Sequence, residues 1–277
     1  MTPSPLPCLS RVPADSLPTL TQLSCGPNSG VALSVVTLGN LLWVVAYVLI
    51  IRKAMRDRTY GIPLVAIALN VTWELYYGLI NPIPGAAFRI AAVVWLLLDV
   101  LIVYQLIRFG REEAWPPEIQ RNFYPVVLGT MVLAFTGHVF FHKWISHVGV
   151  FPDEGSGISG ILINVVMSIL FVFMALNRRD GHGLSYGAAW TKFVGTALIG
   201  VGLVMEYSAR SAGTWDFQFR RSGTTEWHDM TAQGLGTYPA GFIYWMAAVI
   251  FIFDALYVLY LHRRRSASAG ATLRAAA

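Results

Sequence analysis

Charged residues are scarce in this chain, and their scarcity excludes an ordinary soluble domain. Of 277 residues, 13% are charged and 55% are hydrophobic, whereas about a quarter of the residues in typical globular proteins are charged. The mean hydropathy is +0.55. The net charge of +5 does not indicate nucleic-acid binding, because the basic residues form short clusters between apolar runs, as they do beside membrane helices.

Cysteine is also scarce. Cys8 and Cys25 are the only two, and both precede the first apolar run. They could form a disulfide outside the cytoplasm, and two free thiols are an equal alternative. Residues 1–30 are rich in proline, serine and threonine and lack a basic stretch followed by an apolar core, so no cleavable signal peptide is predicted. We expect residues 1–30 to form a flexible extracytoplasmic leader.

The sequence lacks the motifs of several cofactor-dependent classes of enzyme. No two aspartates are adjacent, so the carboxylate cluster that would hold Mg²⁺ on a diphosphate is missing. Neither a P-loop nor a C-x-x-C motif is present. His138 and His142 could share a helical face, but with no third ligand evident a packing role is favoured over a metal site. We therefore expect no cofactor and no metal.

Long apolar runs, by contrast, are abundant. A helix needs about 20 mostly apolar residues to cross the hydrocarbon layer of a membrane. Seven segments approach that requirement, namely 31–51, 61–80, 90–108, 124–145, 158–176, 186–207 and 239–261. The sequence therefore predicts an all-α polytopic membrane protein, with a seven-helix transmembrane domain over 31–261 and a basic cytoplasmic tail over 262–277. The segment 124–145 contains Thr136, Gly137 and His138 and could span poorly, but the charge pattern requires it to cross.

The basic residues indicate the orientation of this bundle. Seven crossings place thirteen of the 20 lysines and arginines on one side, namely Arg52, Lys53, Arg56, Arg58, Arg108, Arg111, Arg121, Arg178, Arg179, Arg263, Arg264, Arg265 and Arg274. Because positive residues accumulate in the cytoplasm, the amino terminus is predicted outside the cell membrane and the carboxyl terminus inside. Lys192, early in the sixth segment, is expected to extend toward the basic side. The loop 208–238 is predicted to be external, with aromatic residues at the interface or, alternatively, folded as a lid.

Three carboxyl groups interrupt the apolar runs, those of Glu74, Asp99 and Asp254. A charge at the bilayer centre costs on the order of 3 kcal/mol, and burial favours the un-ionised form of a carboxylic acid. An un-ionised acid in an apolar cavity can donate a proton. We therefore predict that Glu74, Asp254 and Asp99 are catalytic. The alternative for each is a structural hydrogen bond between helices, and for Asp99 the two interpretations are balanced.

Each of these acids shares a helical face with an aromatic residue. Trp95 precedes Asp99 by four residues, and Asp254 lies between Phe251 and Tyr257. Aromatic faces stabilise a migrating positive charge, and a dry pocket prevents quenching by water. This combination suits chemistry through a carbocation. The predicted substrate-binding residues are Asn70, Trp73, Tyr77, Trp95 and Tyr257.

The stretch Asn70-Val71-Thr72-Trp73-Glu74 resembles the N-x-x-W-E element in the second helix of a known enzyme family. This family comprises the integral-membrane terpene cyclases of meroterpenoid and indole-diterpenoid pathways, with bacterial relatives of the drimentine type. Asp254 resembles the essential acid of the family's last helix, and 94–100 resembles part of its third helix. The resemblance covers roughly 31–261. It implies a seven-helix bundle that performs class II cyclisation, in which Glu74 and Asp254 protonate a terminal alkene or epoxide of a prenylated aromatic or indole compound.

Two other functions would also place polar groups inside a membrane. A proton-coupled transporter uses acids at membrane depth, but it predicts internal repeats and broken helices, and neither is evident. A retinal-type photoreceptor needs a lysine in the last helix, and 239–261 contains none. The sequence thus favours a metal-independent cyclase with a prenylated small-molecule substrate in a lipid bilayer, with the transporter as the alternative and no role for nucleic acid.

Overall fold

The computed structural model describes residues 29–82, 86–113, 116–148, 156–178, 180–210 and 240–276. Within these ranges every regular element is a helix, which confirms the all-α prediction. The elements are α2 (Ser29–Asp57), α3 (Leu64–Leu75), the π-helix η2 (Tyr76–Ile80), α4 (Ala86–Glu113), α5 (Pro117–Arg121), α6 (Phe123–Val148), α7 (Ser156–Asn177), α8 (Tyr186–Arg210) and α10 (Ala240–Ala276). Cys8, Cys25 and most of the loop 208–238 lie outside the described residues.

The predicted apolar segments coincide with these helices, and the chain is a polytopic membrane protein. Five helical segments are long and apolar enough to cross a membrane, namely Ser34–Asp57, Arg89–Glu113, Phe123–Ile145, Ser156–Asn177 and Phe242–Ser266. The apolar segment Leu64–Ile80 is shorter. Helix α6 continues through Thr136, Gly137 and His138 without a break, and large apolar side chains on its outer surface, such as Leu133 with 74% exposure, suit contact with lipid.

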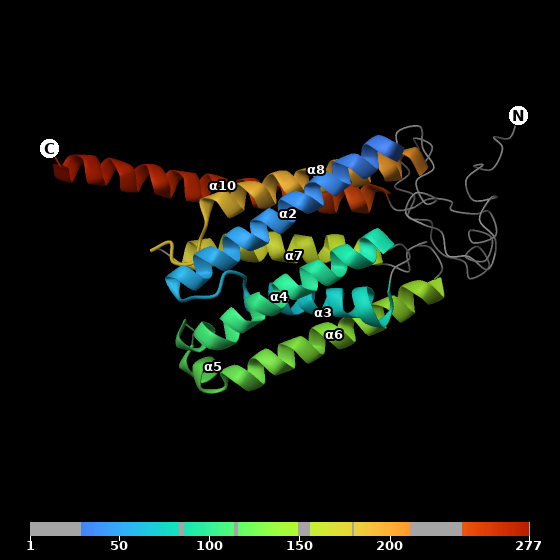
Figure 1. Cartoon of the computed structure of the whole chain (residues 1–277), viewed down its shortest axis with the longest axis horizontal. Helices are drawn as coiled ribbons and strands as arrows, with labels where there is room; N and C mark the ends of the chain where they lie inside the picture. Colours follow the sequence, from blue (N-terminus) through green and yellow to red (C-terminus); the bar gives the residue numbers. More distant parts are fainter. Residues whose placement is uncertain are drawn as a thin grey trace, which may run out of the picture.

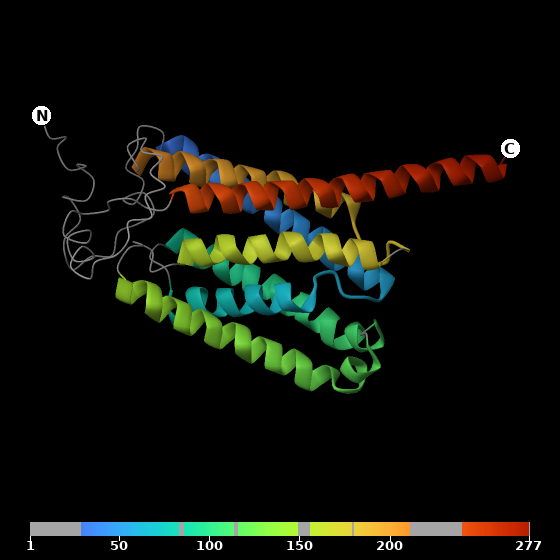
Figure 2. The ribbon, with the colours of Figure 1, turned by 180° about the vertical axis from the view of Figure 1, so that it is seen from behind.

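The helices lie side by side along one common direction (Figure 1). Helix α2 packs along α8, and α10 contacts both α7 and α8. On the other side of the bundle α3 contacts α4 and α6, while α7 joins the two groups by touching α3. Helix α10, the last in the chain, extends beyond the other helices (Figure 2). Its 37 residues correspond to about 55 Å at a rise of about 1.5 Å per residue.

Two glycines set the close approach of α2 and α8. A methyl group added at Gly39 would lie 2.6 Å from the backbone oxygen of Gly195, and one added at Gly195 would lie 2.9 Å from the backbone oxygen of Gly39. Small residues allow membrane helices to approach at backbone distance. This crossing brings Trp43, one turn along α2, against the α8 residues Lys192 and Thr196.

The second predicted segment changes its helical geometry partway along. Helix α3 begins after Pro63 and passes into the π-helical turn η2, where the backbone N–H of Asn81 donates to the carbonyl of Tyr76 at 2.6 Å. Such five-residue turns are rare and are found frequently at functional sites. Glu74 lies two residues before this turn, so the helix is regular up to the acid and changes its geometry just beyond it.

Arg178 joins several helices at one end of the bundle. Its guanidinium group bonds the carboxylate of Glu113 at 2.8 Å and the carbonyl of Tyr60 at 2.8 Å. Arg264 of α10 donates to the carbonyl of Arg178 at 2.7 Å. The ends of α4 and α7, the α2–α3 loop and the basic stretch of α10 are therefore held together at one end of the bundle.

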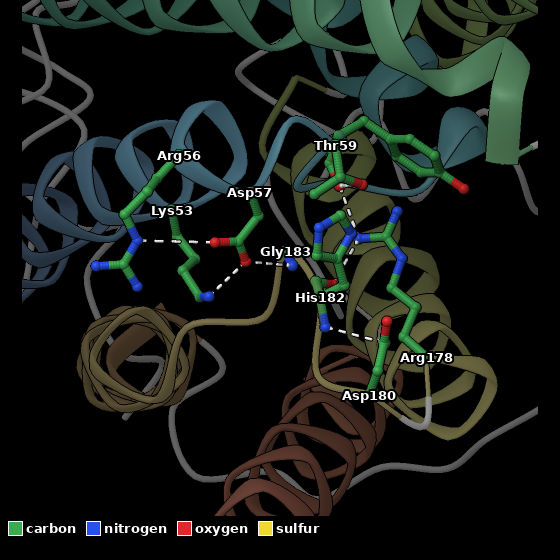
Figure 3. A network of polar contacts seen from close by, with 9 residues as sticks. Lys53, Arg56, Asp57, Thr59, Arg178, Asp180, His182 and Gly183 are labelled. Carbon is green, nitrogen blue, oxygen red and sulfur yellow. Dashed lines mark hydrogen bonds and ion pairs between the residues drawn. The ribbon is translucent and has the colours of Figure 1, made fainter.

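The α7–α8 loop completes this end network (Figure 3). Asp57 pairs with Lys53 and accepts a hydrogen bond from the backbone N–H of Gly183 at 2.8 Å. Gly183 has a φ of 73°, and an added methyl group there would lie 2.6 Å from Thr59, so this position requires glycine. The backbone N–H of His182 donates to exposed Asp180 and holds the pKa of that carboxyl below its usual value.

Candidate active site

The side-chain amide of Asn70 gathers polar groups from three helices. Its nitrogen donates to Glu74 Oε1 at 2.9 Å, to Asp99 Oδ2 on α4 at 2.8 Å, and lies 2.6 Å from Tyr47 Oη on α2. Glu74 is 2% exposed and Asp99 is not exposed at all. The structure therefore brings two of the three predicted catalytic acids together, at a point that the sequence could not specify.

The acid pair, defined as Glu74 and Asp99, has no basic partner among its contacts in the described part of the chain. Both carboxyl groups accept from the same amide nitrogen of Asn70 and are therefore close neighbours, and two such groups in a dry site do not both ionise. Glu74 Oε2 and Asp99 Oδ1 are buried and have no hydrogen-bond partner among the described residues. This arrangement can hold a transferable proton inside the bundle.

Asp254 lies in a different polar cluster. It forms an ion pair with Lys192 of α8, which also donates to Ser168 Oγ of α7 at 2.8 Å. Lys192 and Asp254 are each 1% exposed. The expectation that Lys192 extends toward the basic side is thus wrong, because its ammonium group is held inside the bundle by a carboxylate and a hydroxyl. Asp254 Oδ2 is buried and has no hydrogen-bond partner among the described residues.

Two aromatic residues of α2 connect the two clusters. The ring of Trp43 lies 5.3 Å from Lys192 Nζ, and its indole N–H donates to Thr196 Oγ1 at 3.2 Å. One turn further on, the ring of Tyr47 lies 5.8 Å from that of Trp43, and its hydroxyl reaches Asn70. The acid pair and Asp254 are therefore not in direct contact but lie on either side of this aromatic pair.

The predicted substrate-binding residues of the second segment have defined contacts. Asn70 binds both members of the acid pair. Trp73 is buried and donates from its indole N–H to Ser159 Oγ of α7 at 2.9 Å. Its ring lies 5.4 Å from the ring of Tyr77, which is also buried. An aromatic wall thus continues from the acid pair into the π-helical turn.

The other two predicted binding residues, Tyr257 and Trp95, differ in how deeply they are buried. Tyr257 is buried, and its ring lies 5.3 Å from that of Phe171. Trp95, one turn before Asp99 on α4, is partly exposed. The expectation that Phe251 shares the face of Asp254 is wrong, because Phe251 is 51% exposed and packs on Phe193 at 5.1 Å. Residues three positions apart on a helix do not point in the same direction, and here Phe251 lies on the outer surface of the bundle while Asp254 is buried.

The two predicted histidines bind different partners. A ring nitrogen of His138 lies 2.9 Å from the carbonyl of Leu69. A ring nitrogen of His142 lies 3.2 Å from the amide of Asn81, and its ring lies 5.5 Å from that of Tyr76. Both histidines therefore pack α6 against the second segment, which agrees with the packing role expected for them.

Sequence reasoning missed four residues of these clusters, Trp43, Tyr47, Ser168 and Lys192. An aromatic or a serine residue within an apolar run carries no polar signal of its own. Lys192 gave such a signal, since it lies almost two turns inside α8, which begins at Tyr186. A lysine at that depth predicts a buried partner.

Comparison with known proteins identifies the family. Residues 29–219 match the family described as Pyr4-like transmembrane terpene cyclases, a range that covers well over half of the chain. It includes the acid pair and Lys192 and ends before α10, which carries Asp254. No solved structure matches the chain.

Individual relatives carry the same description. Terpene cyclase cle7 from Aspergillus versicolor is 30% identical over 167 residues, which are 59% of this chain and 67% of the relative. Terpene cyclase ascF from Acremonium egyptiacum is 30% identical over 181 residues, 61% of this chain and 64% of the relative. Terpene cyclase pyr4 from Aspergillus fumigatus is 25% identical over 224 residues, 80% of this chain and 82% of the relative. The chain thus spans about two thirds of the length of the first two.

These similarities also correct one sequence-based expectation. The relatives are fungal proteins, so the finer assignment to a bacterial drimentine-type cyclase is wrong. The expected class of enzyme, a transmembrane terpene cyclase, is confirmed, and it displaces the transporter and photoreceptor alternatives. On the match over residues 29–219, the chain belongs to the Pyr4-like transmembrane terpene cyclases.

Proposed function

We propose that this chain cyclises a prenylated aromatic or indole compound, such as a farnesylated indole, by protonating a terminal alkene or epoxide. The observation that carries the proposal is the acid pair. Glu74 and Asp99 are buried, share the amide of Asn70 and have no cation among their contacts in the described residues. Two neighbouring carboxyl groups in a dry site cannot both ionise, so one of them retains a proton for the substrate.

Aromatic side chains near the acid pair support the carbocation part of the proposal. Trp43 and Tyr47 lie on α2, Trp73 lies on α3 and Tyr77 lies in η2. The hydroxyl of Tyr47 reaches Asn70 of α3. Faces of such rings stabilise a nearby cation by about 0.5 to 2 kcal/mol each. We propose that Asn70, Trp73, Tyr77, Trp95 and Tyr257 hold the prenyl chain while positive charge moves along it.

We further propose that the reaction is metal-independent. The sequence contains no aspartate-rich element for holding Mg²⁺ against a diphosphate. Protonation of an alkene or epoxide leaves no diphosphate to neutralise, so an acid alone is sufficient to start the cascade.

A seven-span topology in the cell membrane is also proposed. It requires Leu64–Ile80 and α8 to cross in addition to the five longer segments. Leu64–Ile80 has 17 residues, at the lower limit of about 17 to 25 for a crossing helix, and α8 has 25. Since the basic loops gather at one end through Arg178, the positive-inside rule places that end in the cytoplasm.

Product formation in membranes tests the proposed function. Membranes that carry the protein are incubated with a farnesylated indole and, separately, with its terminal epoxide, in the presence of a chelator. We expect cyclised product from one of the two, and its loss in Glu74→Gln, because the amide keeps the shape of the side chain without an acidic proton. Glu118→Gln, at an exposed position of α5, serves as the matched control and retains activity.

Two results would contradict the proposal. Unchanged turnover in Glu74→Gln would remove this residue from the chemical step. Product that forms only when Mg²⁺ is supplied would show that the reaction does not begin with a protein acid.

A further inference from the structure

Lys192 is the buried residue that the proposed reaction leaves unexplained. Its side chain is among the largest that are completely buried. Its ammonium group bonds Asp254 and Ser168 and lies 5.3 Å from the Trp43 ring and 5.6 Å from the Phe171 ring. A buried charge is tolerated only when it is paired and hydrogen-bonded, and an ammonium group is stabilised over aromatic faces. Every contact of Lys192 therefore suits its charged form.

The charge on Lys192 determines the state of Asp254. An opposite charge in direct contact favours the ionised form of a carboxyl group, and a lysine ammonium group can donate but not accept hydrogen bonds. Asp254 Oδ1 faces Lys192, and Asp254 Oδ2 is buried without a hydrogen-bond partner among the described residues. An unpartnered carboxylate oxygen in an apolar interior is a proton acceptor.

The acid pair has the opposite surroundings. Asn70 donates from a neutral amide to both Glu74 and Asp99, and the described contacts of the pair include no lysine, arginine or histidine. These surroundings favour a proton on the acid pair, whereas an ammonium group in contact with Asp254 favours the ionised form of that carboxyl group. The resulting polarity along the site runs from a proton donor beside α3 and α4 to a proton acceptor beside α8 and α10.

We propose that Lys192 is a positioning residue that keeps Asp254 as a carboxylate, so that Asp254 ends the cyclisation by accepting a proton while the Glu74–Asp99 pair begins it. This inference rests on the proposed cyclase function. It assigns different roles to Glu74 and Asp254, which the family resemblance treats alike. It also explains why a lysine, costly at membrane depth, lies beside an acid of the site.

The proton and electron balance of the proposed reaction is as follows. An O–H bond of the acid pair breaks, and the electron pair of the substrate alkene forms a C–H bond with that proton. Successive alkenes attack the cation and form ring C–C bonds. Finally Asp254 Oδ2 takes a proton from the carbon next to the last cation, and the C–H electron pair becomes a C=C bond. For an epoxide substrate the proton forms an O–H bond while a C–O bond of the ring breaks. In both cases the product is an isomer of the substrate, and exchange with water removes the proton from Asp254 and returns one to the acid pair.

Infrared spectroscopy of the purified, full-length protein tests the charge states without any substrate. The absorption of un-ionised carboxylic acids is expected to decrease in Glu74→Gln or Asp99→Asn and to be unaffected by Asp254→Asn. In Lys192→Met a new un-ionised acid signal is expected, and the double variant with Asp254→Asn should lack it. A loss of signal in Asp254→Asn alone would overturn the proposal, because Asp254 would then carry a proton beside Lys192.

Product analysis tests the consequence for the reaction. In Lys192→Met the cascade should still start, but the share of alkene among the cyclised products should fall on the order of tenfold, with water-trapped alcohols in their place. Lys192→Arg retains the charge and should restore part of the alkene share. Gln105→Met is the control for packing, because it removes another buried bond between helices, from Gln105 to the carbonyl of Ile51 at 2.8 Å.

The two tests separate the two proposals. Equal losses of yield in Lys192→Met and Gln105→Met, with unchanged product ratios, would show a merely structural lysine and overturn the inference. Absence of any cyclised product from the unaltered protein would count against the proposed function, and the infrared result would still decide the charge state of Asp254.

Discussion

Two polar regions of this protein differ in how their charges are compensated. At the loop end, Arg178 faces Glu113, and Asp57 faces Lys53 and the N–H of Gly183. In the interior, Glu74 and Asp99 face each other and a neutral amide. Paired charges at a helix end stabilise the fold, whereas an unpaired acid pair in an apolar interior lowers stability and must be explained by function. Substitutions in the two regions should therefore separate activity from stability.

The largest expected effect is on activity, from Asp99→Asn in the acid pair. Removing one carboxyl group leaves Glu74 without the neighbour that shares its proton, so cyclised product should fall at least about 100-fold. The amount of folded protein should be preserved, because the amide can still contact Asn70. Product formation per folded protein in membranes is the measurement. Activity within about twofold of the unaltered protein would show that Asp99 only braces α4 against α3.

Arg178→Met should have the reverse profile. It removes a partly buried ion pair and a hydrogen bond to the Tyr60 carbonyl, which together are worth about 2 to 4 kcal/mol. The thermal midpoint in detergent should fall by about 5 °C or more, with product formation per folded protein unchanged. Arg178→Lys keeps the charge without the planar, forked guanidinium group, so its thermal midpoint should lie between those of the unaltered protein and Arg178→Met. A selective loss of turnover would place the end network in the reaction.

Gly39→Ala tests the crossing of α2 and α8, on which the polar cluster of Lys192 and Asp254 depends. The added methyl group would lie 2.6 Å from the backbone oxygen of Gly195 and 2.7 Å from Ile199, so α2 and α8 must move apart at a cost of about 1 to 3 kcal/mol. Gly129→Ala on α6 is the matched control, since nothing lies within 4 Å of its added methyl group. Thermal midpoints should drop for the first variant alone, and equal midpoints would contradict the close approach.

The smallest effect is expected at Asp180. The backbone N–H of His182 lowers the pKa of Asp180 in the folded protein, so its stabilising contribution is present above the unfolded pKa of about 3.9 and disappears as the pH falls through the lower folded value. Asp180 is exposed, so Asp180→Asn should shift the thermal midpoint by no more than about 1 °C at pH 7. The difference should shrink as the pH falls through the folded pKa of Asp180. A difference that grows on acidification would have the wrong sign.

Much of the fold could be predicted, because the membrane imposes a simple rule on the sequence. Backbone groups in the hydrocarbon layer must be satisfied internally, which selects helices, and each predicted apolar segment coincides with one. The change from α3 to the π-helical turn at Tyr76 could not be predicted, since the apolar pattern continues through it. The number of crossings and their orientation stay predictions.

The candidate site could be predicted only where one helix carries the signal. Asn70 and Glu74 are four residues apart and share a face, and the structure joins them. That Asp99 meets this face, and that Asp254 meets Lys192 instead, depends on helix contacts that no spacing along the chain encodes. The catalytic roles of Glu74, Asp99 and Asp254 stay predictions until they are tested.

The π-helical turn gives this enzyme a place where its length can change locally. Deleting one residue within Tyr76–Ile80 would close an ordinary α-helical turn and rotate everything beyond it by about 100°. Asn81, which follows the turn, would then move away from His142 of α6, which it now contacts. Asn70 and Glu74 lie before the turn and would keep their positions. Insertions and deletions in this turn could therefore change which side chains face α6 during evolution while Asn70 and Glu74 stay in place.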